Sequence, residues 1–450
     1  MLGQRIQGLR RYYLMKPLLS AKLLQTLAPW RNAPAWHVAF SGGLDSTVLL
    51  HLLASLTNIP PLRAVHVHHG LQAAADAWSG HCQSVCDSLG VPLRVMRVQV
   101  QPGASLERAA RDARYLAFAE VTGAGEVLFT GQHRDDQAET LLFRLLRGAG
   151  VRGLAAMPAH RALAQGHLVR PLLDVTRVEL EAYAQAHHLQ WIEDPSNADP
   201  RFSRNYLRHR VFPVLAQRWP QVVSSLARTA EHLEQAQGLL DELAAMDLQR
   251  ADHPSLFPWL PLRSLALAPL RELSDARQRN ALRHWLAPLT RLPDSDHWAG
   301  WHSMRDAKND AQPLWRLADG ELHRSGERIW WLPFTWSEFS DASVSWPDPQ
   351  KPLELPGNGQ LKFIGEAPQG PLEIRYRQGG EVIEVPGRGR RDLKRLLNEC
   401  GMPGFVRGRL PLLYRGERLL AVPTLAGLWA STSNDWQLHW LPQTCDQGLS

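Results

Sequence analysis

The sequence predicts an α/β protein in which a parallel-sheet domain is followed by a helical domain and a small α+β C-terminal domain. Residues 36–130 alternate short apolar runs with longer segments of helical periodicity, an order typical of a parallel sheet with helices on both faces. The length of 450 residues suits roughly three domains. We expect a basic, helical N-terminal segment over 1–30 and domains over 31–213, 214–345 and 346–450.

The first domain has the clearest strand and helix patterns. Apolar runs predict strands over 36–40, 63–69, 92–100 and 126–130, and helical periodicity predicts intervening helices over 46–56, 73–89 and 104–122. A parallel sheet binds its ligand at the carboxyl ends of its strands. Polar residues that directly follow these strands are therefore candidates for a functional site.

The chain between the first and last domains is predicted to be mainly helical. Helical spacing recurs over 221–248, 271–288 and 295–308. Ten of the 17 tryptophans lie between Trp219 and Trp346, a concentration that favours the core of a small domain over stacking on bases. The proline-rich residues 346–357 are typical of a linker or an edge strand, and one amphipathic helix follows over 392–400 among short strands.

Composition excludes several classes of protein. Four cysteines without a CxxC pair argue against a disulfide framework and against zinc or iron–sulfur ligation, and they favour a reduced, cytoplasmic setting. No run of about 18 apolar residues is present, so no membrane-spanning helix is expected. The net charge of +6 fits an acidic partner such as RNA and equally an arginine-rich genome. The acid-free segment before Asp45 leaves two alternatives to an ordinary N-terminus, a transit peptide and an extension upstream of Met15.

The strongest chemical motif is SGGLDS, between a predicted strand and a predicted helix. Glycines let the backbone approach a ligand, and a helix N-terminus favours a phosphate group, to which the two serines can donate. A plain strand–helix turn is the alternative. The aspartate would repel phosphate unless a cation lay between them, which favours a magnesium-bridged site. The predicted cofactor-binding loop comprises Ser41, Gly42, Gly43, Leu44, Asp45 and Ser46.

This loop resembles the pyrophosphate-binding loop of the N-type ATP pyrophosphatases, the PP-loop superfamily, whose catalytic domain is Rossmann-like. The tRNA(Ile)-lysidine synthase family within it is similar at HVHHGLQ (66–72), ERAARDARY (107–115), GQHRDDQAET (131–140), DPSN (194–197), RNYLRHRVFP (204–213) and the basic segment 387–422. Gln72 and Gln132 depart from residues that are common in that family. The resemblance spans nearly the whole chain and is weakest over 214–345.

The resemblance implies an ATP-dependent ligase that forms a carbon–nitrogen bond. In this family ATP adenylates the C2 carbonyl of the wobble cytidine in the tRNA(Ile) with a CAU anticodon, and the ε-amino group of free L-lysine then displaces AMP. Pyrophosphate is the other product, and the modified tRNA reads AUA instead of AUG. The implied cofactors are ATP and Mg²⁺, and the implied partners are this tRNA, L-lysine and a second subunit of a homodimer, without a membrane.

The resemblance also assigns roles to residues that match the motifs. The predicted catalytic residues are Asp45, His133, Asp136, Glu139 and Arg114, and His68 and His133 are expected to contact ATP. Either His68 or His69 is expected to shape the pocket. Asp45 and Asp136 are the candidate Mg²⁺ ligands. Which carboxylate holds the lysine ammonium group, and whether a carboxylate or His133 takes its proton, stays open. For Asp136 and Glu139, favourable charge at a helix start is the alternative explanation.

Basic residues, mostly arginines, and one asparagine supply the predicted contacts to substrate and tRNA. These residues are Arg111, Arg204, Asn205, Arg208, Arg390, Arg391 and Lys394. A solvated helix face is the alternative for Arg111 and Arg114. Residues 371–420 hold eleven Lys and Arg against six Asp and Glu, interleaved with aromatic residues, which independently indicates RNA contact. A basic but solvated surface is the alternative there.

Two other functions fit the sequence less well. A tRNA thiolase of the same superfamily would need relay or cluster cysteines, and the cysteine spacing disfavours it. A non-catalytic RNA-binding protein with an inactive ATP fold is disfavoured by the intact loop over 41–46.

Overall fold

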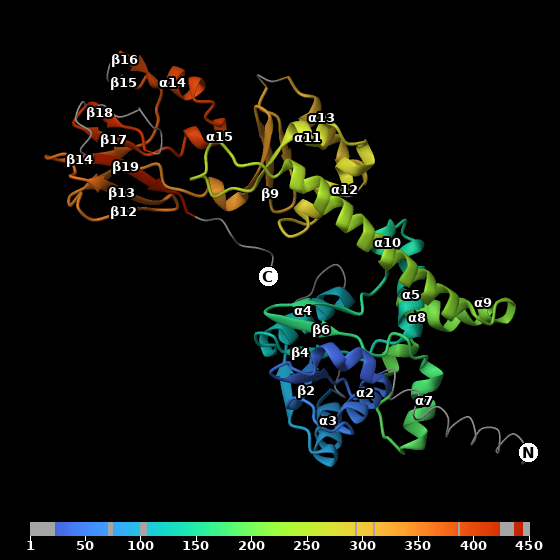
Figure 1. Ribbon diagram of the computed structural model, residues 1–450. Coiled ribbons are helices and arrows are strands. Elements are labelled where there is room, and N and C mark those ends of the chain that lie inside the picture. The colour runs from blue at the N-terminus through green and yellow to red at the C-terminus, as the bar shows by residue number, and fades with distance from the viewer. Residues whose placement is uncertain are drawn as a thin grey trace, which may run out of the picture. The chain divides into compact units, whose positions relative to one another are not determined.

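The computed structural model describes residues 23–70, 75–99, 106–292, 295–308, 311–385, 388–423 and 436–443. The chain divides into two compact units, Met1–Gly238 and Leu239–Ser450 (Figure 1). Most of the predicted basic segment, before residue 23, and the departure at Gln72 lie outside the described residues. Across those residues, no helix combines the length and the apolar character needed to cross a membrane.

The first unit is built on a six-stranded sheet with the order β3-β2-β1-β4-β6-β5. Its strands are β1 (Trp36–Ala39), β2 (Leu62–His68), β3 (Leu93–Arg97), β4 (Val127–Phe129), β5 (His160–Leu163) and β6 (Gly166–Val169). All neighbouring strands are parallel except the β5–β6 hairpin. The first four strands confirm the apolar-run predictions, and the predicted helices are confirmed as α2 (Leu44–Ala54), α3 (Ala75–Leu89) and α4 (Leu106–Val121). The β5–β6 hairpin was not predicted.

Helices cover both faces of this sheet (Figure 1). On one face, Val38 of β1 shares a buried cluster with Leu49 of α2 and Leu180 of α7 (Arg177–Ala186). On the other face, Leu128 of β4 packs with Phe118 of α4. Burial on both faces explains why the central strands β1 and β4 are mostly apolar.

The strand order reverses at β1, which pairs with β2 on one side and β4 on the other. The loops that follow β1 and β4 therefore leave the same edge of the sheet side by side, and the crevice between such loops is the usual ligand site of this fold. Residues 41–46 follow β1, and residues 131–133 follow β4. The fold thus brings together the two predicted motifs with the most polar residues.

Helices after the sheet complete the first unit. They are α5 (Arg134–Leu145), α6 (Val151–Leu154), α7, α8 (Ser203–Tyr206), α9 (Phe212–Arg218) and the first half of α10 (Val222–Ala251), whose second half belongs to the second unit. There are 3₁₀ turns at Ala28–Trp30 and Pro195–Ala198. Between α8 and α9 the chain makes a π-helical turn over Leu207–Val211. Leu207 and Phe212 pack with Ala138 of α5, so this turn is fixed against α5. Such turns often occur at functional sites.

The second unit begins with helices and a sheet. Its helices α11 (Leu267–Arg271), α12 (Asp275–Leu286) and α13 (Ala299–Asp306), with α10, confirm the predicted helical segments, and a 3₁₀ turn spans Ser295–Trp298. A four-stranded sheet, not predicted, has the order β7-β10-β9-β8 from Ser264–Ala266, Arg328–Pro333, Gly320–Ser325 and Leu314–Arg316. Trp298, Trp301, Trp315 and Trp331 are buried between sheet and helices, which confirms the predicted use of tryptophan in a core.

The C-terminal part contains three further sheets. Their strands are β11 (Val344–Trp346), β12 (Leu353–Leu355), β13 (Gly359–Gly365), β14 (Leu372–Arg375), β15 (Val382–Val385), β16 (Gly389–Asp392), β17 (Leu412–Arg415), β18 (Arg418–Ala421) and β19 (Trp436–Leu441). The orders are β11-β14-β17-β18, β12-β13-β19 and β15-β16. Because β11 and β12 lie at sheet edges, residues 346–357 are confirmed as edge-strand sequence. The helices are α14 (Leu393–Glu399), which confirms the prediction, and α15 (Gly404–Arg407), and a 3₁₀ turn spans Phe334–Ser337.

Arg409 is buried in this part, and its removal should destabilise the second unit. Its guanidinium donates to the carbonyl oxygens of Trp336 and Gly357 and, at 2.9 Å, to Asn358 Oδ1. Arg409→Met would leave these buried acceptors without their donors, at a cost of about 3 kcal/mol. Thermal and urea unfolding measure this loss. The exposed Arg415→Met is the matched control, and equal stability of the two variants would contradict the structural role of Arg409.

Candidate active site

The loop after β1 forms a tight turn against the rest of the first unit. Gly42 has a φ of +81°, and a Cβ there would lie 3.0 Å from Cys82 Sγ, so both its backbone angle and its surroundings require glycine. The Gly42 carbonyl accepts a hydrogen bond of 2.8 Å from the backbone N–H of Ile192. Gly131, after β4, is equally close-packed, because a Cβ there would lie 3.0 Å from the Asp45 carbonyl carbon. The two loops are therefore in contact.

The two serines of the loop form hydrogen bonds within it. Ser46 Oγ donates to the Gly43 carbonyl at 3.0 Å and accepts from the Ser41 backbone N–H at 3.2 Å. The two hydroxyl oxygens lie 3.0 Å apart, and Ser41 Oγ accepts from the Gly43 N–H at 3.3 Å. Gly43 is the N-cap residue of α2 and offers no side chain to the helix start. The first N–H groups of α2 thus stay available for an anion.

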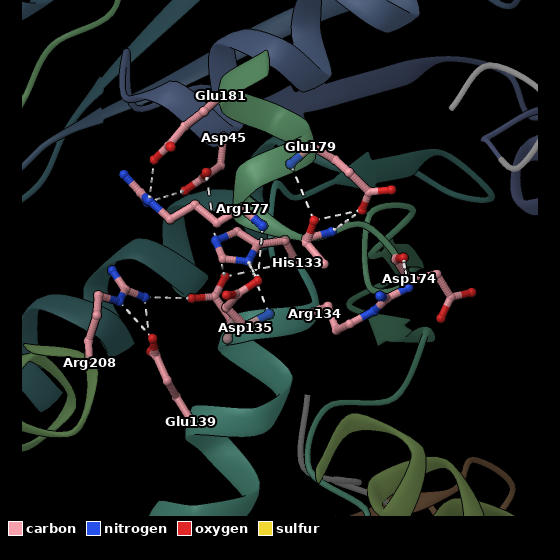
Figure 2. Close-up of polar contacts among 12 residues, drawn as sticks. Asp45, His133, Arg134, Asp135, Glu139, Asp174, Arg177, Glu179, Glu181 and Arg208 are labelled. Carbon is pink, nitrogen blue, oxygen red and sulfur yellow. Dashed lines mark hydrogen bonds and ion pairs between the residues drawn. The ribbon is translucent and has the colours of Figure 1, made fainter. Parts of the chain in front are cut away.

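His133 is the N-cap residue of α5 and lies next to this loop. Its Nδ1 accepts from the backbone N–H of Asp135 at 3.2 Å, while Asp136 Oδ2 accepts from the His133 backbone N–H at 3.1 Å, a complete capping box. Because Nδ1 accepts, the neutral ring carries its proton on Nε2. The ring is fully buried, and Nε2 points toward Asp45 and Asp136, whose carboxylate oxygens lie 3.7 and 3.5 Å away (Figure 2).

Charges around His133 act in opposite directions. Burial favours the neutral ring, but Asp135, Asp136 and Asp45 outweigh it and raise the pKa of His133 above its usual value. The helix cap instead requires an unprotonated Nδ1. Burial raises the pKa of Asp45, although His133 and Arg177 oppose this shift. Asp45 Oδ1 is buried and has no hydrogen-bond partner among the described residues. An ionised carboxylate with such an atom requires a positive partner.

Arg208 joins the two predicted carboxylates of α5. Its Nε donates to Glu139 Oε1 at 2.6 Å, and its Nη2 donates to Glu139 Oε2 and Asp136 Oδ1, each at 2.9 Å (Figure 2). Burial alone would lower the pKa of Arg208, but Glu139 and Asp136 raise it. Burial also raises the pKa of Glu139, while the bonds from Arg208 favour its charged form. Arg208 was predicted to bind substrate or tRNA, and the structure shows it committed to these carboxylates.

A cavity of about 920 Å³ opens over the two loops. The predicted site residues that line it are Ser41, Gly43, Leu44, Asp45, Ser46, Arg111, Arg114, Asp136 and Arg208. Within the described residues, Gly42, His68, His133, Glu139, Arg204 and Asn205 do not line it. This volume is at the upper end of the range for small-molecule sites. The cavity therefore has room for a nucleotide together with a second group.

Several predicted residues outside the cavity wall have structural contacts. Asn205 Nδ2 donates to the carbonyls of Ser196 and Asp199 at 2.8 and 2.9 Å, and so holds the loop after DPSN. Arg204 Nη2 lies 3.5 Å from Thr140 Oγ1. His133 and Glu139 lie behind Asp45 and Asp136, so any influence they have on a ligand acts through those two carboxylates.

Arg111 and Arg114 of α4 also line the cavity, and neither forms an ion pair with a carboxylate within the described residues. Arg114 donates from Nε and Nη2 to His69 Nε2 at 3.3 and 3.2 Å. Burial and Arg114 lower the pKa of His69 to about 4, so the ring is neutral at physiological pH. Burial and Arg111 lower the pKa of Arg114. The wall favours an anion. His66 and His69, rather than the predicted His68, line it.

Comparison with known proteins decides between the candidate families. A PP-loop domain model matches residues 15–215, a TilS substrate binding domain model matches 265–330, and a TilS substrate C-terminal domain model matches 372–440. The tRNA(Ile)-lysidine synthase of Pseudomonas fluorescens is 66% identical, covering 96% of this chain and 98% of that protein. The tRNA(Ile)-lysidine synthases of Pseudomonas aeruginosa (63% identical, 96% and 99% covered) and Escherichia coli O157:H7 (43%, 85% and 90%) also match.

The chain belongs to the tRNA(Ile)-lysidine synthase family. Membership confirms the resemblance inferred from the sequence and the PP-loop fold, and it identifies the protein as a ligase that uses ATP. The TilS substrate binding domain model matches 265–330, within the region where the sequence resemblance was weakest and where the unpredicted sheet lies.

The residues predicted to bind tRNA near the C-terminus of this lysidine synthase family member lie on an exposed hairpin and helix. Arg390 and Arg391 lie on β16 and Lys394 on α14, all exposed. Neighbouring arginines are neutralised: Arg388 and Arg395 pair with Glu399, at 3.0 and 3.2 Å. No such ion pair involves Arg390, Arg391 or Lys394 in the part of the chain that the structure describes. These three cations are therefore open to an outside partner.

Sequence reasoning named His69 only as an alternative to His68 for shaping the pocket, and it did not single out Arg177, which also lines the cavity. Arg177 Nη1 lies 3.8 Å from Asp45 Oδ2, and its Nε donates to Glu181 Oε1 at 3.0 Å. No motif marked Arg177, because it lies 132 residues beyond Asp45. Its position at the start of a capped helix after a sheet strand was the only available signal.

Proposed function

We propose that this enzyme ligates L-lysine to C2 of the wobble cytidine in the CAU-anticodon tRNA(Ile) through an adenylated tRNA, in the cytoplasm and as a homodimer. AMP and pyrophosphate leave, and the codon read changes from AUG to AUA. The observation that carries the proposal is one cavity lined by the phosphate loop, by the carboxylates of Asp45 and Asp136 beside it, and by Arg111 and Arg114 of α4. This arrangement suits a reaction that gathers ATP, a cationic amine and an RNA base.

In the first step, the loop over 41–46 binds the phosphates at the N-terminus of α2. The cytidine O2 attacks the α-phosphorus, and pyrophosphate leaves with the electron pair of the broken bond. Arg111 and Arg114 lie on the cavity wall, where they would bind the α-phosphate or the lysine carboxylate. Fixed cations at these places stabilise the charge that develops on oxygen.

The carboxylates of Asp45, in the loop, and of Asp136, beside it, fit a magnesium ion. Asp45 Oδ1 is buried without a hydrogen-bond partner in the described part of the chain, and oxygen is the ligand that Mg²⁺ prefers. Asp45 and Asp136, which both line the cavity, would hold it. When bound, the ion supplies positive charge that offsets the phosphates.

In the second step, the lysine amine attacks C2 and AMP leaves. The amine must first lose a proton, and Asp45 and Asp136, which both line the cavity beside His133, are the candidate acceptors. Glu139 is 3% exposed and bonded to Arg208, so we assign it the role of holding Arg208 and Asp136 in place. His133 orients Asp136 through the capping box.

The deciding experiment incubates the protein with ATP, Mg²⁺, labelled L-lysine and total bacterial tRNA. We expect lysine-dependent release of pyrophosphate and label only in the CAU-anticodon isoleucine tRNA. A folded protein that binds ATP but puts no label into tRNA would disprove the proposal. Mass measurement of the purified protein under assay conditions tests the homodimer.

Reversing charge at Arg390 and Arg391 should weaken tRNA binding. The double variant Arg390→Glu/Arg391→Glu is expected to lower affinity at every tRNA sequence and to reduce the slope of log affinity against log salt by about 2, because each phosphate contact releases counterions. Filter binding at several salt concentrations measures both. The exposed Lys351→Glu is the control. An unchanged slope in the double variant would show that this surface is merely solvated.

A further inference from the structure

We propose that Arg177 is a further binding residue of this site, which grips the pyrophosphate part of ATP and stabilises it as the leaving group. The inference rests on the proposed adenylation reaction. Arg177 lines the cavity and reaches the phosphate loop from α7, whereas Arg111 and Arg114 reach the cavity from α4. Its guanidinium lies between Asp45 and Glu181 (Figure 2).

The start of α7 is held firmly in place. Thr176 and Glu179 form a capping box, with bonds of 2.7 and 3.2 Å between side chains and backbone. The Arg177 backbone N–H donates to Asp135 Oδ2 at 2.9 Å, which ties α7 to the cap of α5. Further along α7, Leu180 is fully buried in the same cluster as Leu49 of α2. The backbone that carries Arg177 is therefore fixed relative to the phosphate loop.

The side chain of Arg177, by contrast, is only loosely engaged. Nε donates to Glu181 at 3.0 Å, but Glu181 is 43% exposed, and such surface pairs contribute little. Nη1 is 3.8 Å from Asp45, beyond hydrogen-bond distance. Arginine has five donors, so most of them stay available. The side chain is 38% exposed toward the cavity and can take a new anionic partner.

The charge balance of the loop requires such a cation. Asp45, Asp135 and Asp136 surround the start of α5. Arg208 is committed to Glu139 and Asp136, and the side chain of Arg134 donates to the Asp174 carbonyl. When the α-phosphorus bond to the bridging oxygen breaks, its electron pair leaves with pyrophosphate, and the negative charge on that group increases. A guanidinium fork beside the loop binds it with charge-assisted hydrogen bonds.

The test measures binding of inorganic pyrophosphate, with Mg²⁺, by calorimetry and by inhibition of the full reaction. Arg177→Ala is expected to weaken pyrophosphate affinity about tenfold or more and to raise KM for ATP similarly, with KM for lysine and tRNA affinity unchanged. Arg177→Lys should recover part of the loss, because it keeps the charge but not the fork. Circular dichroism and melting confirm that the variants fold.

Two controls separate binding from a structural role. Arg134→Ala removes one arginine at the start of α5, whose side chain donates to the Asp174 carbonyl instead (Figure 2), and should leave pyrophosphate affinity unchanged. Glu181→Gln removes the helix pair but keeps Arg177, so affinity should hold or rise. Wild-type affinity in Arg177→Ala, or an equal loss in Glu181→Gln, overturns the inference. A wild-type enzyme that neither binds nor releases pyrophosphate overturns the proposed function itself.

Discussion

Replacing Asp45 with asparagine is expected to reduce lysine-dependent pyrophosphate release by at least about 100-fold, while the enzyme still folds and binds tRNA. Asparagine has the same shape but no charge, so the loop keeps its backbone contacts and loses the negative group that faces His133 and Arg177 at 3.7 and 3.8 Å. A cation held against the phosphates would lose its ligand. The exposed C-terminal arginines are untouched, so tRNA affinity should stay at the wild-type value.

The same variant should lose activity without losing stability. Burial raises the pKa of Asp45, which means that the folded protein disfavours the ionised carboxylate. Removing that charge should therefore leave the melting temperature unchanged or raise it, as is common where a functional residue is strained. The exposed Asp174→Asn is the control for the substitution itself. If Asp45→Asn keeps its turnover, Asp45 has no catalytic role and serves only at the start of α2. A large fall in melting temperature would show a structural role.

The parts of the fold that could be predicted are those whose signal is local. The central strands β1 and β4 are short, largely apolar runs that are buried on both faces, whereas β3 at the sheet edge is partly exposed and its apolar residues alternate with arginines. Strand β9 gave no such signal, since its buried positions are Gly320, Leu322 and Arg324. Arg324 is 2% exposed because it donates to carbonyls at the end of α13, including Ala307 at 2.6 Å. An arginine in the core breaks the alternation that marks a strand.

The same distinction applies to the site. The loop over 41–46 and the segment 131–140 are contiguous motifs, so their residue types could be recognised, and the reversal of strand order places them together. The partners of those residues could not be predicted. Arg208 bonds to Glu139 from 69 positions away, and that contact depends on the π-helical turn packed against α5. The choice of His69 over His68 depends on where β2 ends.

The second large effect is expected when the hydrogen bonds of Arg208 are removed. Arg208→Met would leave Glu139, 4% exposed at its side chain, and Asp136 without their common counter-charge. Removing one partner of a buried ion pair costs about 3 kcal/mol or more, because the remaining charge stays desolvated. We expect a corresponding fall in the unfolding free energy of the first unit, measured by urea denaturation, together with loss of lysine-dependent turnover.

A double variant decides whether the buried charge is the cause. In Arg208→Met/Glu139→Gln the uncompensated carboxylate is gone, so most of the lost stability should return, whereas turnover should not, because Asp136 still lacks its partner. The matched control is Arg201→Met, since Arg201 makes an equally short ion pair, 2.7 Å to Asp199, but is 88% exposed and should leave stability nearly unchanged. If the double variant is as unstable as Arg208→Met, packing of the arginine stem against the π-helical turn, rather than charge, holds this part of the site together.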